Sequence, residues 1–300
     1  MKIVQGDEIP LVRGLEYRGG MFHSRRLLEG APGTVDNFQL SIGVSQGDFY
    51  SPRHRHNFEQ IRVQLDGEAY FDRDGTMTPG TVGYFPEGVF YGPQSQKPGM
   101  ISTTAVLQFG GASGCGYLSN KETRAAMEEL NQLGEFKNGA FRRKEPLYGK
   151  KNADGNQAIW EHHHKRPIVI PKPRYAKPVM MDSHNSNWIA VEGAPGVSEK
   201  LLGVFTERRT EMGRLKLQPG ASFEAKGRGV YLVLRGAGKV GDMAARALTT
   251  LHLELGERER ITATEEMEIM HFGLPNLAGV TMTTEHDEDP ADEVVSEAAE

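Results

Sequence analysis

The run His54-Arg55-His56-Asn57-Phe58-Glu59-Gln60, followed seven residues later by Gly67, is the strongest candidate for chemistry in this chain. His54 and His56 are two residues apart, so on a strand both imidazoles leave the same face and can converge on one ion. Neutral imidazole is the commonest metal-binding side chain, and a carboxylate or amide oxygen can complete the set. This spacing predicts a metal site, with Glu59 or Gln60 as the source of the oxygen.

The residues after this run alternate between polar and apolar, as in a strand with two different faces. The polar face holds Gln60, Arg62 and Gln64, and the other face holds Ile61, Val63 and Leu65. If the polar face lines a barrel interior, the cavity suits a polar or anionic ligand, with the guanidinium of Arg62 as its anchor.

Short strands separated by turn residues must position this run. The chain has 36 glycines, many of them between short runs rich in Val, Ile, Leu, Tyr and Phe, which favours a sandwich or barrel. Strands are predicted at residues 37–50, 61–72, 81–86 and 101–110, and a second strand-rich region runs from about residue 201 to 284. The two regions repeat one pattern, in which a strand ends on Gly67 or on Gly236.

One helix is predicted between these regions. Ser119-Asn120-Lys121-Glu122 has the form of a capping box, an apolar face follows, and Gly134 suits the end of the helix. Residues 134–185 then look like a connector rich in basic residues, Gly and Pro. Its run His162-His163-His164 invites a metal assignment, but adjacent side chains point in different directions, which disfavours one shared ion.

The spacing of a second stretch completes a resemblance to the cupin superfamily. That family's first motif is His-x-His, a glutamate and a closing glycine; its second is Pro-Gly, a short strand, Pro-x-Gly and a histidine. Here His54, His56 and Gly67 match the first motif, with Gln60 in the place of the glutamate. The second motif is matched by residues 79–91, in which Tyr91 takes the place of the last histidine.

This resemblance implies one divalent transition metal, which in cupins is Fe, Mn, Ni, Co, Cu or Zn. His54 and His56 are then the expected ligands, helped by the amide oxygen of Gln60. Glu59 should point away by strand parity, although a bulge would bring it in. Tyr91 is open to three interpretations: a ligand, an acid or base beside the metal, or a packed aromatic residue.

The second region resembles a cupin more loosely, because Phe223, Ala225 and Gly229 fall where ligands would be. The predicted fold is therefore all-β in the main, with two cupin-type double-stranded β-helix (jelly-roll) barrels joined by a helical connector. The expected domains are a metal-site barrel (1–118), a helix and connector (119–195), a degenerate barrel (196–284) and a mobile acidic tail (285–300).

Three functions remain open from the sequence. The first is a metal-dependent oxidoreductase of the quercetin dioxygenase kind, acting on a small polar or enolisable substrate that Arg62 and Gln64 orient while Tyr91 moves a proton. The second is a cupin lyase, isomerase or decarboxylase that uses Tyr91 as acid or base. The third is a cupin that only binds a small ligand, which the missing glutamate and third histidine favour.

Charge and composition restrict the partners and the compartment. The 40 acidic and 35 basic residues give a formal charge of −5, but eight of the acids lie in residues 285–300, and the rest of the chain is at +3. A body so close to neutral argues against nucleic acid as a partner. No long apolar segment or secretion signal is visible, so we expect a cytoplasmic protein with no membrane partner. Cys115 is the only cysteine, and the sequence leaves a homodimer open.

Overall fold

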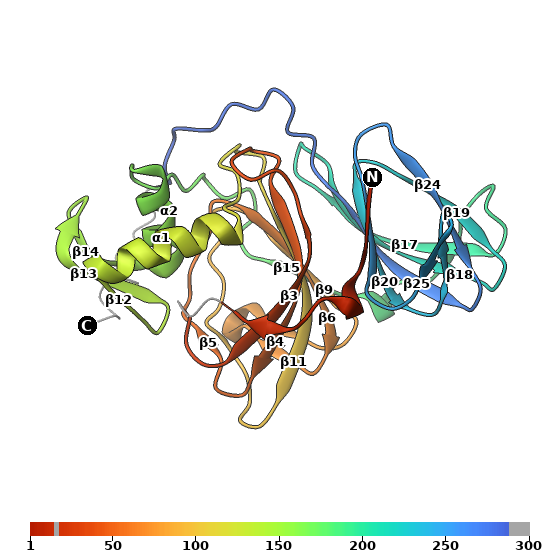
Figure 1. Cartoon of the computed structure of the whole chain (residues 1–300), viewed down its shortest axis with the longest axis horizontal. Helices are drawn as coiled ribbons and strands as arrows, with labels where there is room; N and C mark the ends of the chain where they lie inside the picture. Colours follow the sequence, from red (N-terminus) through yellow and green to blue (C-terminus); the bar gives the residue numbers. More distant parts are fainter. Residues whose placement is uncertain (15–17, 288–300) are drawn as a thin grey trace. The chain divides into compact units, whose positions relative to one another are not determined.

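The computed structural model describes residues 1–14 and 18–287, and its contacts divide the chain into two compact units. The N-terminal unit holds Leu11–Ser24, Glu29–Met180 and the chain from Val280 onward. The C-terminal unit holds Met1–Pro10, Arg25–Leu28 and Met181–Gly279. Antiparallel strands dominate both units (Figure 1), which confirms the mainly β fold predicted from the sequence.

The N-terminal unit is built on a seven-stranded sheet and a four-stranded sheet. In spatial order the larger sheet contains β15 (Val179–Asp182), β9 (Thr81–Phe85), β6 (Glu59–Asp66), β11 (Ile101–Phe109), β4 (Phe38–Gln46), β3 (Phe22–Glu29) and β2 (Val12–Arg13). The smaller sheet contains β5 (Tyr50–Ser51), β10 (Gln94–Ser95), β7 (Ala69–Tyr70) and β8 (Thr76–Met77). The four strands predicted for this region are confirmed.

Strand β6 has the two faces that its alternation predicts. Gln60 lies opposite Phe85 and Arg62 opposite Gly83 across the β6–β9 ladder, so these four residues share one face. That face looks into the barrel, where an aromatic cluster packs around Arg62. Ile61 and Val63 lie on the other face and are buried as well. The barrel interior at β6 therefore combines polar side chains of β6 with the aromatic rings around Arg62.

The predicted helix is confirmed as α1 (Asn120–Leu133). Both capping-box bonds form, since Glu122 donates its backbone N–H to Ser119 Oγ (3.2 Å) and Ser119 donates its own to Glu122 Oε2 (2.8 Å). Ala126 and Leu130 bury the apolar face, and the helix ends directly before Gly134.

The segment predicted as a connector has more structure than expected. It forms a three-stranded sheet of β12 (Gly134–Lys137), β13 (Ala140–Leu147) and β14 (Lys150–Asp154), followed by α2 (Gly155–His164), and Figure 1 shows this sheet beside both helices. The sequence feature that indicates this hairpin is Asn138-Gly139, which joins β12 to β13 with positive φ at both residues (50° and 87°). That dipeptide is typical of a two-residue hairpin turn.

The C-terminal unit repeats the pairing of a large and a small sheet. The seven-stranded sheet contains β1 (Lys2–Gln5), β23 (Thr249–Leu253), β20 (Gly229–Arg235), β25 (Met267–Gly273), β18 (Thr210–Leu217), β17 (Val197–Phe205) and β16 (Ile189–Ala190). The four-stranded sheet contains β19 (Ser222–Lys226), β24 (Arg258–Ala263), β21 (Gly238–Val240) and β22 (Met243–Ala245). Within residues 1–14 and 18–287, short 3-10 helices form at Gly6–Glu8, Asp72–Asp74 and Ser183–Asn185.

The first strand departs from the expected domain boundaries. Residues 1–118 were expected to form one barrel, yet β1 pairs antiparallel with β23, with Lys2 opposite His252. The physical reason is that β23 would otherwise leave an open sheet edge, which a strand from anywhere in the chain can cover.

The helices of the described residues (1–14 and 18–287) are too short or too polar for a membrane span. Residues 288–300, which hold most of the predicted acidic tail, lie outside the described residues.

Candidate functional site

The predicted His-x-His run lies in the extended segment that leads into β6. His54 and Tyr91 face each other in an isolated antiparallel bridge, with backbone N···O distances of 3.2 and 3.0 Å in the two directions. Gly88 donates its backbone N–H to the carbonyl of His56 (2.8 Å), which anchors the next turn of the same segment. The bridge brings the imidazoles of His54 and His56 to 4.7 Å between ring centroids and sets His54 beside the phenol of Tyr91.

The Tyr91 hydroxyl is the centre of the hydrogen-bond network. His54 Nδ1 lies 2.6 Å from the carbonyl oxygen of Pro52, which can only accept, so Nδ1 carries the proton and Nε2 carries a lone pair. The Tyr91 hydroxyl, 3.0 Å from that Nε2, therefore donates to His54. It also accepts from Gln60 Nε2 (3.0 Å) and from Arg62 Nη2 (3.2 Å).

Arg62 is fully engaged in holding this network. Its Nε and Nη2 donate to Gln60 Oε1 at 3.0 and 2.8 Å, and its Nη1 donates to Gln94 Oε1 at 2.8 Å. The guanidinium also stacks over Phe85, 4.6 Å from the ring centroid. Arg62 thus positions Gln60 and places its positive charge beside the Tyr91 oxygen, a different use from the substrate anchor expected from the sequence.

Both site histidines are held neutral. Burial lowers the pKa of His54 and of His56 well below the usual value, and the nearby guanidinium groups of Arg18 and Arg62 lower both further. His56 stacks on Phe58 at 4.3 Å, and its buried Nδ1 has no hydrogen-bond partner among the described residues. The site therefore contains two neutral imidazoles, one of them with an unsatisfied ring nitrogen.

A small pocket opens at this end of the N-terminal barrel. Its wall combines apolar side chains with a few polar ones, as ligand sites commonly do. The lining residues are His54, Arg55, Phe90, Lys150, Asn152, Ala153, Asp154, Gln157, Ile168 and Ile170. Those from β14 and α2 belong to the segment that the sequence suggested was only a connector, so the α1–β12–β13–β14–α2 segment contributes to the site.

Asp154 links this segment to the barrel mouth. Its carboxylate caps α2 by accepting from the backbone N–H groups of Asn156 and Gln157, and it pairs with Arg18 at 2.7 Å. Both side chains of the pair are about nine-tenths buried. Sequence reasoning missed Arg18 and Asp154, because nothing local to either residue indicates a partner 136 positions away.

Glu59 does not join the histidines. It lies on the opposite face of β6, as strand parity predicts, in contact with Tyr84 and near Glu87. Burial, together with the Glu87 carboxylate, raises the pKa of Glu59 to about 8. Glu87 is satisfied by Ser113 (backbone N–H at 2.8 Å, hydroxyl at 2.5 Å) and by Arg174 at 2.9 Å.

Gln64 also lies apart from the Tyr91 network. Its amide nitrogen donates to the carbonyl of Asp66 (2.7 Å) and to Ser102 Oγ (2.8 Å), and its oxygen accepts from Thr104 (3.0 Å). These bonds tie the far end of β6 to β11. The predicted set is therefore brought together in part: His54, His56, Gln60, Arg62 and Tyr91 meet, whereas Glu59 and Gln64 do not.

The donors at the barrel mouth fit a transition metal through two imidazoles and a phenol oxygen. Imidazole suits Zn, Cu, Fe and Ni, and the bond from His54 Nδ1 to a carbonyl is the orienting contact typical of metal-bound histidine. The orphaned ring nitrogen of His56 adds a second nitrogen donor. The oxygen of Gln60 is held by Arg62, and within the described residues no cluster of three His, Cys, Asp or Glu forms. A metal here would therefore depend on His54, His56 and Tyr91.

The histidine run on α2 has a structural role. His162 contacts Glu129 of α1 at 2.7 Å, His163 lies 3.7 Å from Glu122 of the same helix, and the ring of His164 packs at a tilt against Trp160 of α2. Burial lowers the pKa of His164 to about 4. The three rings have different partners, as the sequence argument expected, and His162 and His163 join α2 to α1.

Cys115 is buried, and burial raises the pKa of its thiol to about 11. The thiol is therefore unreactive at neutral pH.

The C-terminal barrel has no equivalent site. Its interior is filled by apolar residues of both sheets: Val197, Leu215, Leu217, Ala225, Val233, Val240, Leu251, Leu253, Ile261, Met267 and Ile269. Ala225 occupies one of the ligand positions and is fully buried. The hydroxyl of Tyr231 bonds to the backbone of Lys226, and His271 stacks on Tyr231 at 4.6 Å. A lone histidine in an apolar core is a packing feature.

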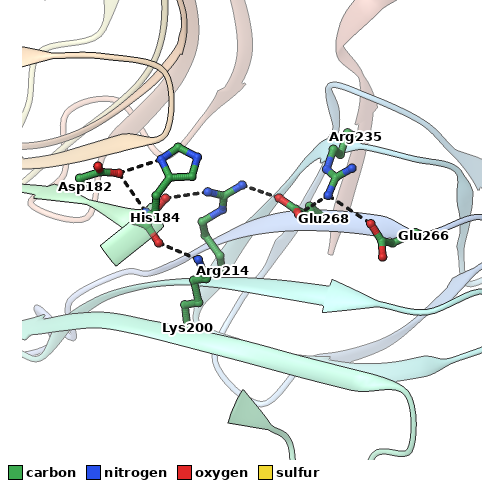
Figure 2. Close-up of polar contacts among 8 residues, drawn as sticks. Asp182, His184, Lys200, Arg214, Arg235, Glu266 and Glu268 are labelled. Atoms are coloured by element: carbon green, nitrogen blue, oxygen red, sulfur yellow. Dashed lines mark hydrogen bonds and ion pairs between the residues drawn. The ribbon is translucent and has the colours of Figure 1, made fainter. Parts of the chain in front are cut away.

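Figure 2 shows a separate polar cluster on the face of the same C-terminal sheet that lies opposite the apolar interior. Arg214 donates to Ser183 Oγ (2.7 Å) and pairs with Glu268, which also pairs with Arg235 at 2.5 Å. Lys200 donates to the Ser183 carbonyl at 2.7 Å, and burial, reinforced by Arg214, lowers its pKa. Each of these drawn charges has a partner, so the cluster holds strands β17, β18 and β25 to the turn at residue 183.

Comparison with known proteins places the chain by its fold. No protein-family model matches the chain, and no curated protein matches its sequence. Among solved structures, a candidate dioxygenase from Nostoc punctiforme PCC 73102 aligns with a TM-score of 0.62 at 12% identity, over 96% of this chain and 87% of that chain. A variant of oxalate decarboxylase from Bacillus subtilis aligns at 0.52 and 14%, over 92% and 77%.

A bacterial pirin from Escherichia coli, solved in complex with nickel(II), aligns with a TM-score of 0.52 at 12% identity, over 91% of this chain and 98% of that chain. These three are cupin-fold proteins, and the chain shares their fold. At such low identity the likeness establishes the cupin fold and leaves the reaction to be argued from the site.

Proposed function

We propose that this protein is a cupin-type enzyme that transfers a proton to a small organic anion, in the manner of a lyase, isomerase or decarboxylase. The observation that carries the proposal is the Tyr91 hydroxyl, which accepts from Gln60 and Arg62 while it donates to His54.

This arrangement suits Tyr91 to the role of general acid. When a carbon–carbon bond of a carboxylate substrate breaks, CO₂ leaves without the bonding electron pair, and the Tyr91 proton moves to the carbon that keeps the pair or to the enolate oxygen. The phenolate left behind keeps two donated hydrogen bonds, one of them from the positive guanidinium of Arg62. Water then returns a proton to the tyrosine, which closes the cycle.

His54 and Arg62 prepare Tyr91 for this step. The lone pair on His54 Nε2 orients the hydroxyl and fixes the position of its proton before the reaction. Because burial and the neighbouring guanidinium groups disfavour a charged imidazole, His54 does not take the proton permanently. The aromatic shell around Arg62 excludes water and strengthens its charge on the phenol oxygen.

The experiment compares Tyr91→Phe with wild type on a panel of 2-oxo acids, 3-oxo acids and dicarboxylates in D₂O, following C–H exchange by NMR and release of CO₂. Tyr84→Phe is the matched control, because Tyr84 is an equally buried tyrosine on the opposite face of the sheet. We expect loss of 10²-fold or more in turnover with Tyr91→Phe, on the order of a general-acid contribution, and little change with the control. Equal turnover in wild type and Tyr91→Phe would refute the role.

A second candidate, a metal-dependent dioxygenase, is supported by the paired imidazoles of His54 and His56 and by the likeness to the candidate dioxygenase and the nickel-bound pirin. A metal held by these histidines and Tyr91 would supply a Lewis acid with open positions for substrate oxygens. In that case the hydrogen bonds from Arg62 and Gln60 would stabilise the deprotonated Tyr91 oxygen as a ligand.

Elemental analysis of protein made without a histidine tag separates the two candidates. Near one equivalent of a redox metal, lost in His54→Ala/His56→Ala, together with oxygen uptake on diketones, flavonols or phenolic acids, would support the dioxygenase. Proton exchange that persists in metal-stripped protein would support the acid–base enzyme. No metal after reconstitution and no turnover on either panel would leave a cupin that only binds a small ligand.

A further inference from the structure

Arg55 is a buried cation in the wall of the pocket beside His54. Its side chain is only 3% exposed, and the guanidinium carbon lies 4.7 Å from the centroid of the Phe90 ring, which is also in the wall. Lys150 adds a second positive charge to the pocket and forms no ion pair within the described residues. The acid in the lining, Asp154, is paired with Arg18 at 2.7 Å, so the two cations still favour an anionic ligand in this partly apolar pocket.

The carboxylate now bound to Arg55 comes from the far end of the described chain. Arg55 Nη1 pairs with Asp287 Oδ2 at 2.8 Å, and Nη2 donates to the backbone carbonyl of Asp287 at 3.0 Å. Asp287 is therefore a carboxylate bound at the pocket wall by a charge-assisted contact, which is the interaction a ligand carboxylate would make.

The segment that carries Asp287, residues 280–287, is held by few contacts. Thr283 donates its backbone N–H to Ser113 (2.9 Å), Asp287 donates its own to Ile170 (2.8 Å), and the Ile170 N–H donates to His286 Nδ1 (3.0 Å). All eight side chains of the segment are exposed or half-buried. No side chain of the segment is fully buried, so the main cost of detaching it is the loss of the Asp287 pair with the buried Arg55, which a ligand carboxylate would replace.

We infer that Arg55 is the anion-binding residue of this pocket and that Asp287 occupies it until a ligand carboxylate takes its place. The apolar walls formed by Phe90, Ile168 and Ile170 suit an aryl or short alkyl body, so the ligand class is a small aryl or alkyl carboxylate. The inference rests on the proposed function, because it takes this pocket as the substrate site: the pocket wall includes His54, which is hydrogen-bonded to Tyr91.

The exchange replaces one carboxylate on Arg55 by another, so the tethered Asp287 acts as an intramolecular competitor. If it occupies Arg55 for about nine-tenths of the time, the apparent affinity of a carboxylate ligand falls about tenfold. Removing Asp287 should raise the apparent affinity for the carboxylate ligand about tenfold, whereas removing only the acidic residues after it should leave the affinity unchanged.

The test measures benzoate binding by isothermal titration calorimetry on four forms of the full chain. These are wild type, Asp287→Asn, a chain ending at Glu285 and a chain ending at Asp287, the last being the control that loses the remaining acids but keeps the competitor. Benzamide, which has the same ring and no charge, is the control ligand. Circular dichroism and thermal melts check that each form is folded.

We expect benzoate to bind Asp287→Asn and the chain ending at Glu285 about tenfold more tightly than wild type, with the chain ending at Asp287 unchanged and benzamide weak throughout. Adding Arg55→Gln to Asp287→Asn, which leaves no unpaired carboxylate behind, should abolish the gain. Equal benzoate affinity in all four forms, or no saturable binding to Asp287→Asn, would overturn the inference. Tyr91→Phe should keep benzoate binding, so failure of the proposed reaction would appear separately, as unchanged turnover in that variant.

Discussion

The buried pair Glu59 and Glu87 predicts a specific dependence of stability on pH. Glu59 is 1% exposed, and its pKa is raised to about 8 by burial and by the Glu87 carboxylate, against about 4.3 for an unperturbed glutamate in the unfolded chain. Between these two values the folded protein holds a proton that the unfolded chain has lost. Stability from this group is therefore fully present below about pH 4 and is lost as pH rises toward 8.

The size of the effect follows from linkage. Where the folded state binds one proton more than the unfolded chain, the free energy of unfolding falls by about 1.4 kcal/mol per pH unit. Raising the pH from 5.5 to 7.5 should therefore lower the free energy of unfolding by roughly 2.5 kcal/mol. Glu59→Gln keeps the shape of the protonated acid and cannot ionise. The difference in unfolding free energy between this variant and wild type should therefore grow by that amount over the same interval.

Urea unfolding at pH 5.5, 6.5 and 7.5, followed by tryptophan fluorescence, measures this difference. Glu128→Gln, a change at an exposed helix position, is the control and should follow wild type at every pH. Parallel curves for wild type and Glu59→Gln from pH 5.5 to 7.5 would show that Glu59 is already ionised in the folded protein, and the reasoning from burial would fail.

Three further changes test the scaffold, each by urea unfolding. Ser119→Ala removes one half of the capping box and should cost about 1 kcal/mol, so an unchanged midpoint would contradict the assigned cap. Gly111→Ala would place a methyl group 2.3 Å from Glu87 Oε2 and should cost roughly 1–3 kcal/mol; a neutral result would mean that the Glu87 side chain can move aside. Glu161→Ala leaves the guanidinium of Arg143, only 4% exposed, without its 2.8 Å partner and should lower the free energy of unfolding by roughly 3–5 kcal/mol. A loss below about 1 kcal/mol would show that the Arg143 guanidinium becomes hydrated in the variant.

The parts of the site that depend on local spacing could be predicted from the sequence. The alternation along β6 separates Glu59 from Gln60 and Arg62, and the structure confirms this separation. The cupin spacing also predicted that Tyr91 meets His54, because the turn at Pro86 and Gly88 returns the chain to the start of β6 at a fixed length.

The parts that depend on distant segments could not be predicted. Arg18 and Asp154 are 136 positions apart, and Arg55 and Asp287 are 232 apart, so no local pattern links either pair. The contacts of Arg62 could not be predicted for a related reason. A lone arginine on a polar strand face looks like a ligand anchor until Gln94, from another strand, is seen to take its third donor.

The pairing of β1 with β23 has a consequence for how this chain can be made and divided. Lys2 pairs with His252, so during synthesis β1 has no partner strand until the ribosome has made β23. A fragment cut between the two barrel regions would carry β1 away on the wrong piece, leaving β23 with a bare edge prone to pairing with other molecules. The sheet of the C-terminal unit is therefore closed by a strand that precedes the N-terminal barrel in the sequence, and the two barrel regions cannot be separated without opening that sheet.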